Sequence, residues 1–130
     1  MNCSLDTSIL IRAITNDLPE KREKVMALLS KEGMKCEVAD LAITETVYVL
    51  TKLHGYSRES VVKKLGFFLN LECVNYNRAL FDEVFSMFLL HPKLSFNDCC
   101  LGVYAKLNAA EPLFTFDRKL ANQIDGAEEL

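Results

Sequence analysis

The chain has 130 residues, of which 50% are hydrophobic and 25% are charged, as expected of a single domain spanning residues 1–130 with one core. The net charge of −3 excludes a broadly basic surface that captures nucleic acid by charge alone, although an acidic centre that first recruits metal stays compatible with it. No apolar run reaches the roughly 20 residues needed to cross a bilayer, and residues 1–15 carry Asp6 and Arg12. We therefore expect a cytoplasmic protein without a membrane partner.

The first half of the chain alternates short apolar segments with helix-capping patterns. Asp17-Leu18-Pro19-Glu20 has the form of a capping box, Gly33 is a helix stop, and Asp40 and Ser57 are expected N-caps. In chain order these signals predict a strand at 2–5 and helices at 8–15 and 19–32, then a strand at 35–39, helices at 41–53 and 57–70, and a strand at 71–75.

The second half continues the alternation. It predicts a helix from Asn77 to His91, a helix from Ser95 to Asn108, a strand at 113–116, a short helix after Asp117 and a last edge strand at 127–130. Alternating strands and helices imply an α/β fold, with a parallel sheet covered by helices on both faces. Ligands of such sheets bind beyond the carboxyl ends of the strands, and Asp6 and Asp117 follow two of the predicted strands.

The cysteines and histidines give no sign of a zinc site. The five cysteines are odd in number and include no C-x-x-C pair, so we interpret them as free thiols in a reducing cytosol. The two histidines stand alone beside loop signals, and neither has a partner at ligand spacing.

Four acidic residues are candidates for chemistry, and each has a structural alternative. Asp6 ends a strand, but it is equally a cap for the next helix. Glu45 lies in a helix that is apolar on most sides, so we expect a largely buried helix on which a glutamate needs a partner or a function, unless it lies on a narrow wet stripe with Lys52. Asp98 forms a capping-box pattern with Ser95, and Asp117 is placed to cap the last helix.

Some neighbouring polar residues are weaker candidates. Thr7, Ser8 and Thr115 are suited to hold water or phosphate by hydrogen bonds, although turn and cap chemistry explains each of them singly. Arg118 and Lys119 follow Asp117 and are candidate contacts for a phosphate backbone, with plain solvation as the alternative.

Taken together, four segments resemble the PIN-domain family, and in particular VapC-type toxin ribonucleases. The family's opening is similar to Leu5-Asp6-Thr7-Ser8 with Thr15-Asn16-Asp17-Leu18-Pro19-Glu20, and its glutamate helix is similar to Ile43-Thr44-Glu45-Thr46-Val47. Its third acid resembles Leu94-Ser95-Phe96-Asn97-Asp98, and its closing motif resembles Leu113-Phe114-Thr115-Phe116-Asp117-Arg118. Ser8 departs from a commoner asparagine, and Asn97-Asp98-Cys99-Cys100 departs from a run of small residues, but neither change removes a carboxylate.

The resemblance implies a three-layer α/β/α sandwich with a central parallel sheet, in which Asp6, Glu45, Asp98 and Asp117 gather at one end. It implies an Mg²⁺- or Mn²⁺-dependent endoribonuclease that hydrolyses phosphodiester bonds of single-stranded or structured RNA. It also implies a homodimer and, for the toxin branch, a cognate antitoxin that covers the acidic site.

A working hypothesis follows, together with two rivals. Asp6, Glu45 and Asp98 bind the metal, Asp117 completes or tunes the site, and repulsion among the acids raises their pKa values until the cation arrives. One rival is a catalytically silent PIN-like module that binds RNA or protein. The other is a small phosphoryl-transfer or receiver-like domain, against which the absence of a Gly-rich phosphate loop argues.

Overall fold

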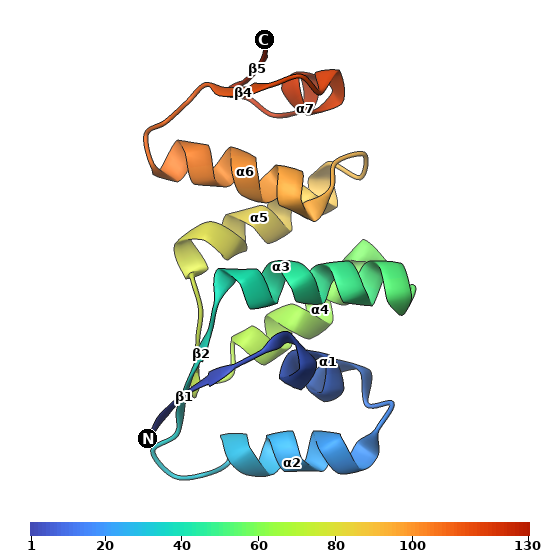
Figure 1. Ribbon diagram of the computed structural model, residues 1–130, viewed down its shortest axis with the longest axis vertical. Coiled ribbons are helices and arrows are strands. Elements are labelled where there is room, and N and C mark those ends of the chain that lie inside the picture. Colours follow the sequence, from blue (N-terminus) through green and yellow to red (C-terminus); the bar gives the residue numbers. More distant parts are fainter. The chain divides into compact units, whose positions relative to one another are not determined.

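The computed structural model describes residues 1–130, and the chain divides into two compact units, Met1–Asn77 and Arg78–Leu130. Each unit has its own parallel sheet, with helices beside it (Figure 1). None of the helices has both the length and the apolar character that a membrane span requires. That residues 1–130 act as a single domain stays a prediction.

The first unit contains three strands and five helical segments, and its predicted order of elements is confirmed. Its elements are β1 (Asn2–Leu5), α1 (Thr7–Thr15), α2 (Pro19–Leu29), β2 (Lys35–Val38), α3 (Asp40–Tyr48), the π-helix η1 (Val49–Leu53), α4 (Arg58–Leu69) and β3 (Val74–Asn75).

The sheet of the first unit has the strand order β1-β2-β3, and all its pairings are parallel. Cys3 pairs with Cys36 and Leu5 with Val38, and this face of the sheet is the less exposed one. The alternate positions, such as Glu37, carry polar side chains that are exposed, because successive residues of a strand point to opposite faces. Leu5 is buried and is the last residue of β1, so the sheet fixes the position of the backbone at the next residue, Asp6.

Two predicted caps of the first unit are wrong. Asp17 does not cap α2, because its carboxylate accepts hydrogen bonds from Arg12 at 2.9 Å and from Thr15 at 2.8 Å; the cap position is Leu18, which has no side-chain bond. Asp40 lies in the first turn of α3, and its cap position is Ala39. The α2 helix ends at Leu29 rather than at residue 32, and β3 is shorter than the predicted strand at 71–75.

The predicted helix at 41–53 is continuous but changes its hydrogen bonding. Its second part, η1, is a π-helix in which the His54 amide donates to the Val49 carbonyl at 3.1 Å. The expectation that this helix is largely buried is wrong for one face, where the Leu41 side chain is 80% exposed and Tyr48 is 59% exposed. The buried side of α3 is formed by Ala42, Ile43, Thr46 and Val47.

The second unit contains α5 (Arg78–Leu90), α6 (Phe96–Leu107), β4 (Leu113–Thr115), α7 (Arg118–Gln123) and β5 (Ala127–Glu129). Phe81 and Phe85 of α5 pack with Phe96 of α6, with ring centroids 5.7–6.2 Å apart. The strands β4 and β5 pair in parallel, and the edge strand is confirmed. Both units are thus α/β structures with parallel strands and flanking helices, which confirms the predicted fold class and is consistent with a PIN-like fold.

Candidate active site

Asp6 lies directly after β1 and is the N-cap of α1. Its Oδ1 accepts hydrogen bonds from the Ser8 hydroxyl at 2.6 Å and from the Ile9 amide at 3.2 Å. These bonds, that of Ser8 foremost, lower the pKa of Asp6 from its ordinary value. The expectation of a raised pKa is therefore wrong for Asp6 within this unit, because local hydrogen bonds stabilise its charged form.

The arrangement leaves Asp6 exposed and suited to bind a cation. Both bonds engage Oδ1, and Oδ2 takes part in neither. Thr7 is the first residue of α1 and is half-buried, whereas Ser8 is exposed beside the carboxylate. Ser8 thus has a role that its position alone did not reveal, since its hydroxyl orients the Asp6 carboxylate.

Glu45 lies on the exposed face of α3. Leu41 and Tyr48 precede and follow it at helical spacing and are both exposed, while Thr46 beside it is buried. The alternative of an exposed stripe is therefore the one that the structure favours, since Lys52 is exposed as well, and burial does not demand a partner for Glu45. An exposed carboxylate on a well-packed helix still offers oxygen atoms to a cation.

Asp98 takes part in the capping box of α6. The Asp98 amide donates to the Ser95 hydroxyl at 3.0 Å, and Asp98 Oδ2 accepts from the Ser95 amide at 3.3 Å. The structural role that the sequence suggested is confirmed. It does not exclude a second role, because only Oδ2 takes part in the box.

Asp117 is the N-cap of α7, as the sequence predicted. Its Oδ1 accepts from the Lys119 amide at 2.9 Å and from the Leu120 amide at 3.3 Å. The Thr115 hydroxyl accepts a hydrogen bond from the Asp117 amide at 3.0 Å, so Thr115 positions the turn before the helix. Arg118 forms an ion pair with Glu129 at 3.1 Å.

These carboxylates have the donor chemistry that Mg²⁺ or Mn²⁺ prefers, because both are hard cations with oxygen ligands. Asp6, Glu45 and Asp117 are exposed, and Asp98 is half-buried. Inside either unit, no three His, Cys, Asp or Glu side chains converge on a point where they could hold a metal ion. The residues therefore fit the metal by the type of their donor atoms, and neither unit by itself brings three of them together.

The cysteines are free thiols, as predicted. The Cys3 thiol donates to Cys36 Sγ at 3.0 Å across the paired strands β1 and β2. Burial, and after it the hydrogen bond with Cys3, raises the pKa of the Cys36 thiol to about 12. Cys36 is therefore protonated at neutral pH and is not a nucleophile.

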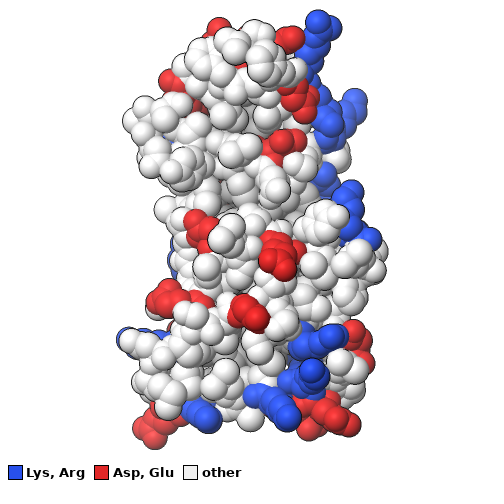
Figure 2. Space-filling model, in the orientation of Figure 1, with Lys and Arg blue, Asp and Glu red and all other residues white.

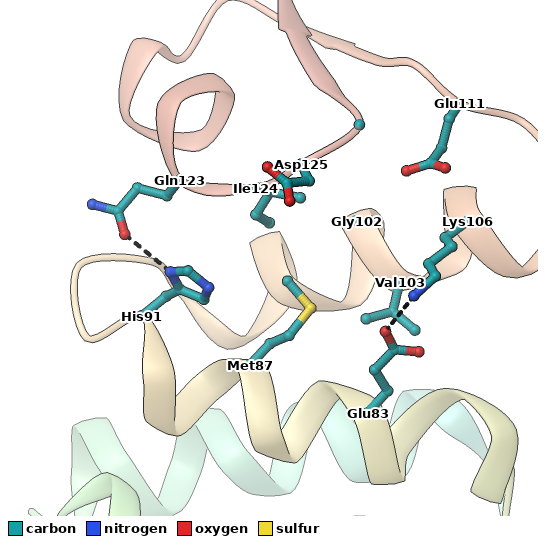
Figure 3. Close-up of a pocket in the computed structure, with 11 residues that line it drawn as sticks. Glu83, Met87, His91, Gly102, Val103, Lys106, Glu111, Gln123, Ile124 and Asp125 are labelled. Carbon is teal, nitrogen blue, oxygen red and sulfur yellow. Dashed lines mark hydrogen bonds and ion pairs between the residues drawn. The ribbon is translucent and has the colours of Figure 1, made fainter.

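The second unit contains a cavity of 480 Å³ that none of the predicted carboxylates lines (Figure 3). Most of its polar groups already have partners there. Lys106 pairs with Glu83 at 3.0 Å, and His91 Nδ1 lies 3.2 Å from Gln123 Oε1. Met87, Val103 and Ile124 supply its apolar lining. Because these pairs engage its polar side chains and no predicted carboxylate lines it, the cavity gives no support to the predicted acidic site.

Comparison with known proteins identifies the family. A search of the curated proteins finds no match to this chain. The model of the PIN domain family matches residues 4–125, which include the four segments on which the resemblance rests. PIN domains are generally metal-dependent nucleases that use divalent cations and bind RNA. Because the match spans nearly the whole sequence, the chain belongs to the PIN domain family.

Proposed function

We propose that this protein is an Mg²⁺- or Mn²⁺-dependent endoribonuclease whose metal is held by Asp6, Glu45 and Asp98, with Asp117 completing or tuning the site. The observation that carries the proposal is the family match over residues 4–125. Asp6 supports it locally, because it is an exposed carboxylate at the end of a parallel strand with its charged form stabilised.

The chemistry required of the residues is simple. When bound, a divalent cation would lower the pKa of water and stabilise the charge on the departing oxygen of a phosphodiester. Asp6 contributes a carboxylate that is ionised at neutral pH and oriented by Ser8. Glu45 and Asp98 contribute further anionic oxygens, and Thr7, Thr115 and Arg118 stay candidates for positioning water or phosphate.

The test compares Asp6→Asn and Asp98→Asn with the parent protein on single-stranded RNA in the presence of Mn²⁺. We expect both variants to lose cleavage while circular dichroism shows an unchanged fold. Glu59→Gln is the matched control, since Glu59 is an exposed acid of α4 outside the proposed site. Full metal-dependent activity in Asp6→Asn and Asp98→Asn would overturn the assignment.

A catalytically silent PIN-like module is the second candidate, and metal binding separates the two. Mn²⁺ should raise the unfolding temperature of the parent protein, because a ligand that binds only the folded state stabilises it. The rise should be smaller in Asp6→Asn. A silent module would show no stabilisation that depends on the acids.

The toxin identity is a finer proposal. We propose that the nuclease acts as the toxin of a toxin–antitoxin pair in the cytoplasm, as a homodimer whose acidic site a cognate antitoxin covers. Brief expression should then arrest growth and produce new RNA 5′ ends, and Asp6→Asn should do neither. Growth arrest by Asp6→Asn at equal protein level would contradict the role of cleavage in toxicity.

A further inference from the structure

A groove of 410 Å³ lies between α1 and α2 in the first unit, beside Asp6. Ser8 lines it, and the Ser8 hydroxyl donates to Asp6 Oδ1 at 2.6 Å. From Leu28 to Lys21 the groove follows α2 for seven residues, which corresponds to about 10 Å of helix. The groove therefore reaches Ser8, which hydrogen-bonds the proposed catalytic carboxylate, and extends from there along α2.

The groove has an apolar floor and a basic rim. Ile9, Val25 and Leu28 form the floor, and Val25 is only 5% exposed. Lys21 and Lys24 of α2 and Arg12 of α1 form the rim. Figure 2 shows basic side chains over α1 and α2 at the lower end of the view, with acidic side chains beside them. The acids Glu20 and Glu23 belong to α2 but do not line the groove.

The two lysines differ from the arginine in being unengaged. Arg12 is held by Asp17 in an ion pair at 2.9 Å. The ammonium groups of Lys21 and Lys24 are both exposed and take part in no ion pair or side-chain hydrogen bond. In a protein of net charge −3, these two unpaired cations, one helical turn apart on the rim of a groove that Ser8 also lines, give the rim a local positive charge that suits an anionic ligand.

We propose that Lys21 and Lys24 bind phosphates of single-stranded RNA next to the bond that is cut, with the strand lying in the α1–α2 groove. The proposal rests on the proposed nuclease function. The groove presents no aromatic side chain on which a base could stack, and Lys is a point charge rather than a planar reader of base edges. Recognition through this groove is therefore of the RNA backbone and does not depend on base sequence.

Binding of a labelled oligouridylate, followed by fluorescence anisotropy, tests the proposal. Asp6→Asn serves as the parent, so that the RNA stays intact. Adding Lys21→Ala and Lys24→Ala should weaken binding on the order of tenfold at low salt and should reduce the slope of log affinity against log salt by about 1.4, since each phosphate contact on a single strand contributes about 0.7. Adding Lys63→Ala and Lys64→Ala instead is the matched control, because these exposed lysines of α4 line a different groove.

The outcomes separate this proposal from the nuclease proposal. An unchanged salt slope in the Lys21/Lys24 variant, or an equal loss in both double variants, would overturn the groove as an RNA site. If the Lys21/Lys24 variant lost binding to polyglutamate but kept its binding to RNA, the groove would be assigned to an acidic protein segment and the RNA proposal would be overturned. Groove-dependent RNA binding in a wild-type protein that cleaves nothing would overturn the nuclease function alone.

Discussion

Two strand ends, one in each unit, are each followed by an aspartate that caps the next helix, but the two helices differ in how deeply they are buried. Asp6 follows β1 and Asp117 follows β4, and each uses its Oδ1 to cap the helix that comes next. The helix after Asp6 has nine residues, of which Leu10, Ile11 and Ala13 are buried. The helix after Asp117 has six residues, and Leu120 is its only buried one. The same N-cap position therefore holds one carboxylate on a helix with three buried residues and the other on a short helix with one.

The neighbours of the two aspartates strengthen the contrast. Ser8 donates directly to the Asp6 carboxylate, whereas the Thr115 hydroxyl accepts from the Asp117 amide and leaves the carboxylate to the backbone. Arg118 pairs with Glu129 instead of Asp117. A functional carboxylate is most effective when neighbouring groups fix its position, so we expect Asp6 to contribute more than Asp117 to the rate of RNA cleavage.

The largest expected effect is on catalysis. Asp6→Asn should reduce the rate of RNA cleavage by at least about a hundredfold, because a metal ligand supplies several kcal/mol of transition-state stabilisation. Asp117→Asn should reduce it on the order of tenfold, as expected for a residue that supports the ligands. Single-turnover cleavage with saturating Mn²⁺ measures both rates. Equal losses in the two variants would remove the functional distinction between the two strand ends.

A smaller effect is expected on stability. Leu10 is fully buried in α1, which packs on α2, α3 and α4, so Leu10→Ala should lower the free energy of unfolding by about 3–4 kcal/mol. Leu120→Ala should cost about 2 kcal/mol, at the low end for buried leucines, because α7 packs mainly on the short strands β4 and β5. Urea unfolding of each variant measures the difference. A larger cost for Leu120→Ala would show that α7 is the better anchored helix.

The comparison also explains what the sequence was able to predict. The strand at 2–5, the Ser57 and Ser95 caps and the order of all elements followed from local patterns, because capping and alternation act over a few residues. The Asp17 cap failed because the pattern ignores Arg12, which lies on the preceding helix and pairs with that aspartate. The exposure of Glu45 stayed open at the level of sequence, because apolar content does not tell which apolar side chains, such as Leu41, stay exposed.

The site shows the same limit. The four acids are predicted from their joint order in the family pattern, and not from any property of each acid alone, and their common site stays a prediction. Lys21 and Lys24 were overlooked because exposed lysines are common. Their spacing of three residues, which puts them on one face of α2, can be seen in the sequence. Only the structure shows that this face borders a groove that Ser8 also lines.

The smallest expected effect concerns the pKa of Asp6. Ser8→Ala removes the main cause of its lowered pKa, so the value should rise toward 3.8, as measured by carbon NMR titration of the carboxyl group. Thr15→Ala is the matched control, because Thr15 does the same for Asp17 and does not contact Asp6.

A lowered folded-state pKa of Asp6 contributes stability that is present above 3.8 and is lost as the pH falls below it. Ser8→Ala should therefore lose less stability than the parent on acidification. If Ser8→Ala left the pKa of Asp6 unchanged, the Ile9 amide would be the cause of the lowered pKa. Asp6 and Asp117 would then differ only in how well the helix that each one caps is buried.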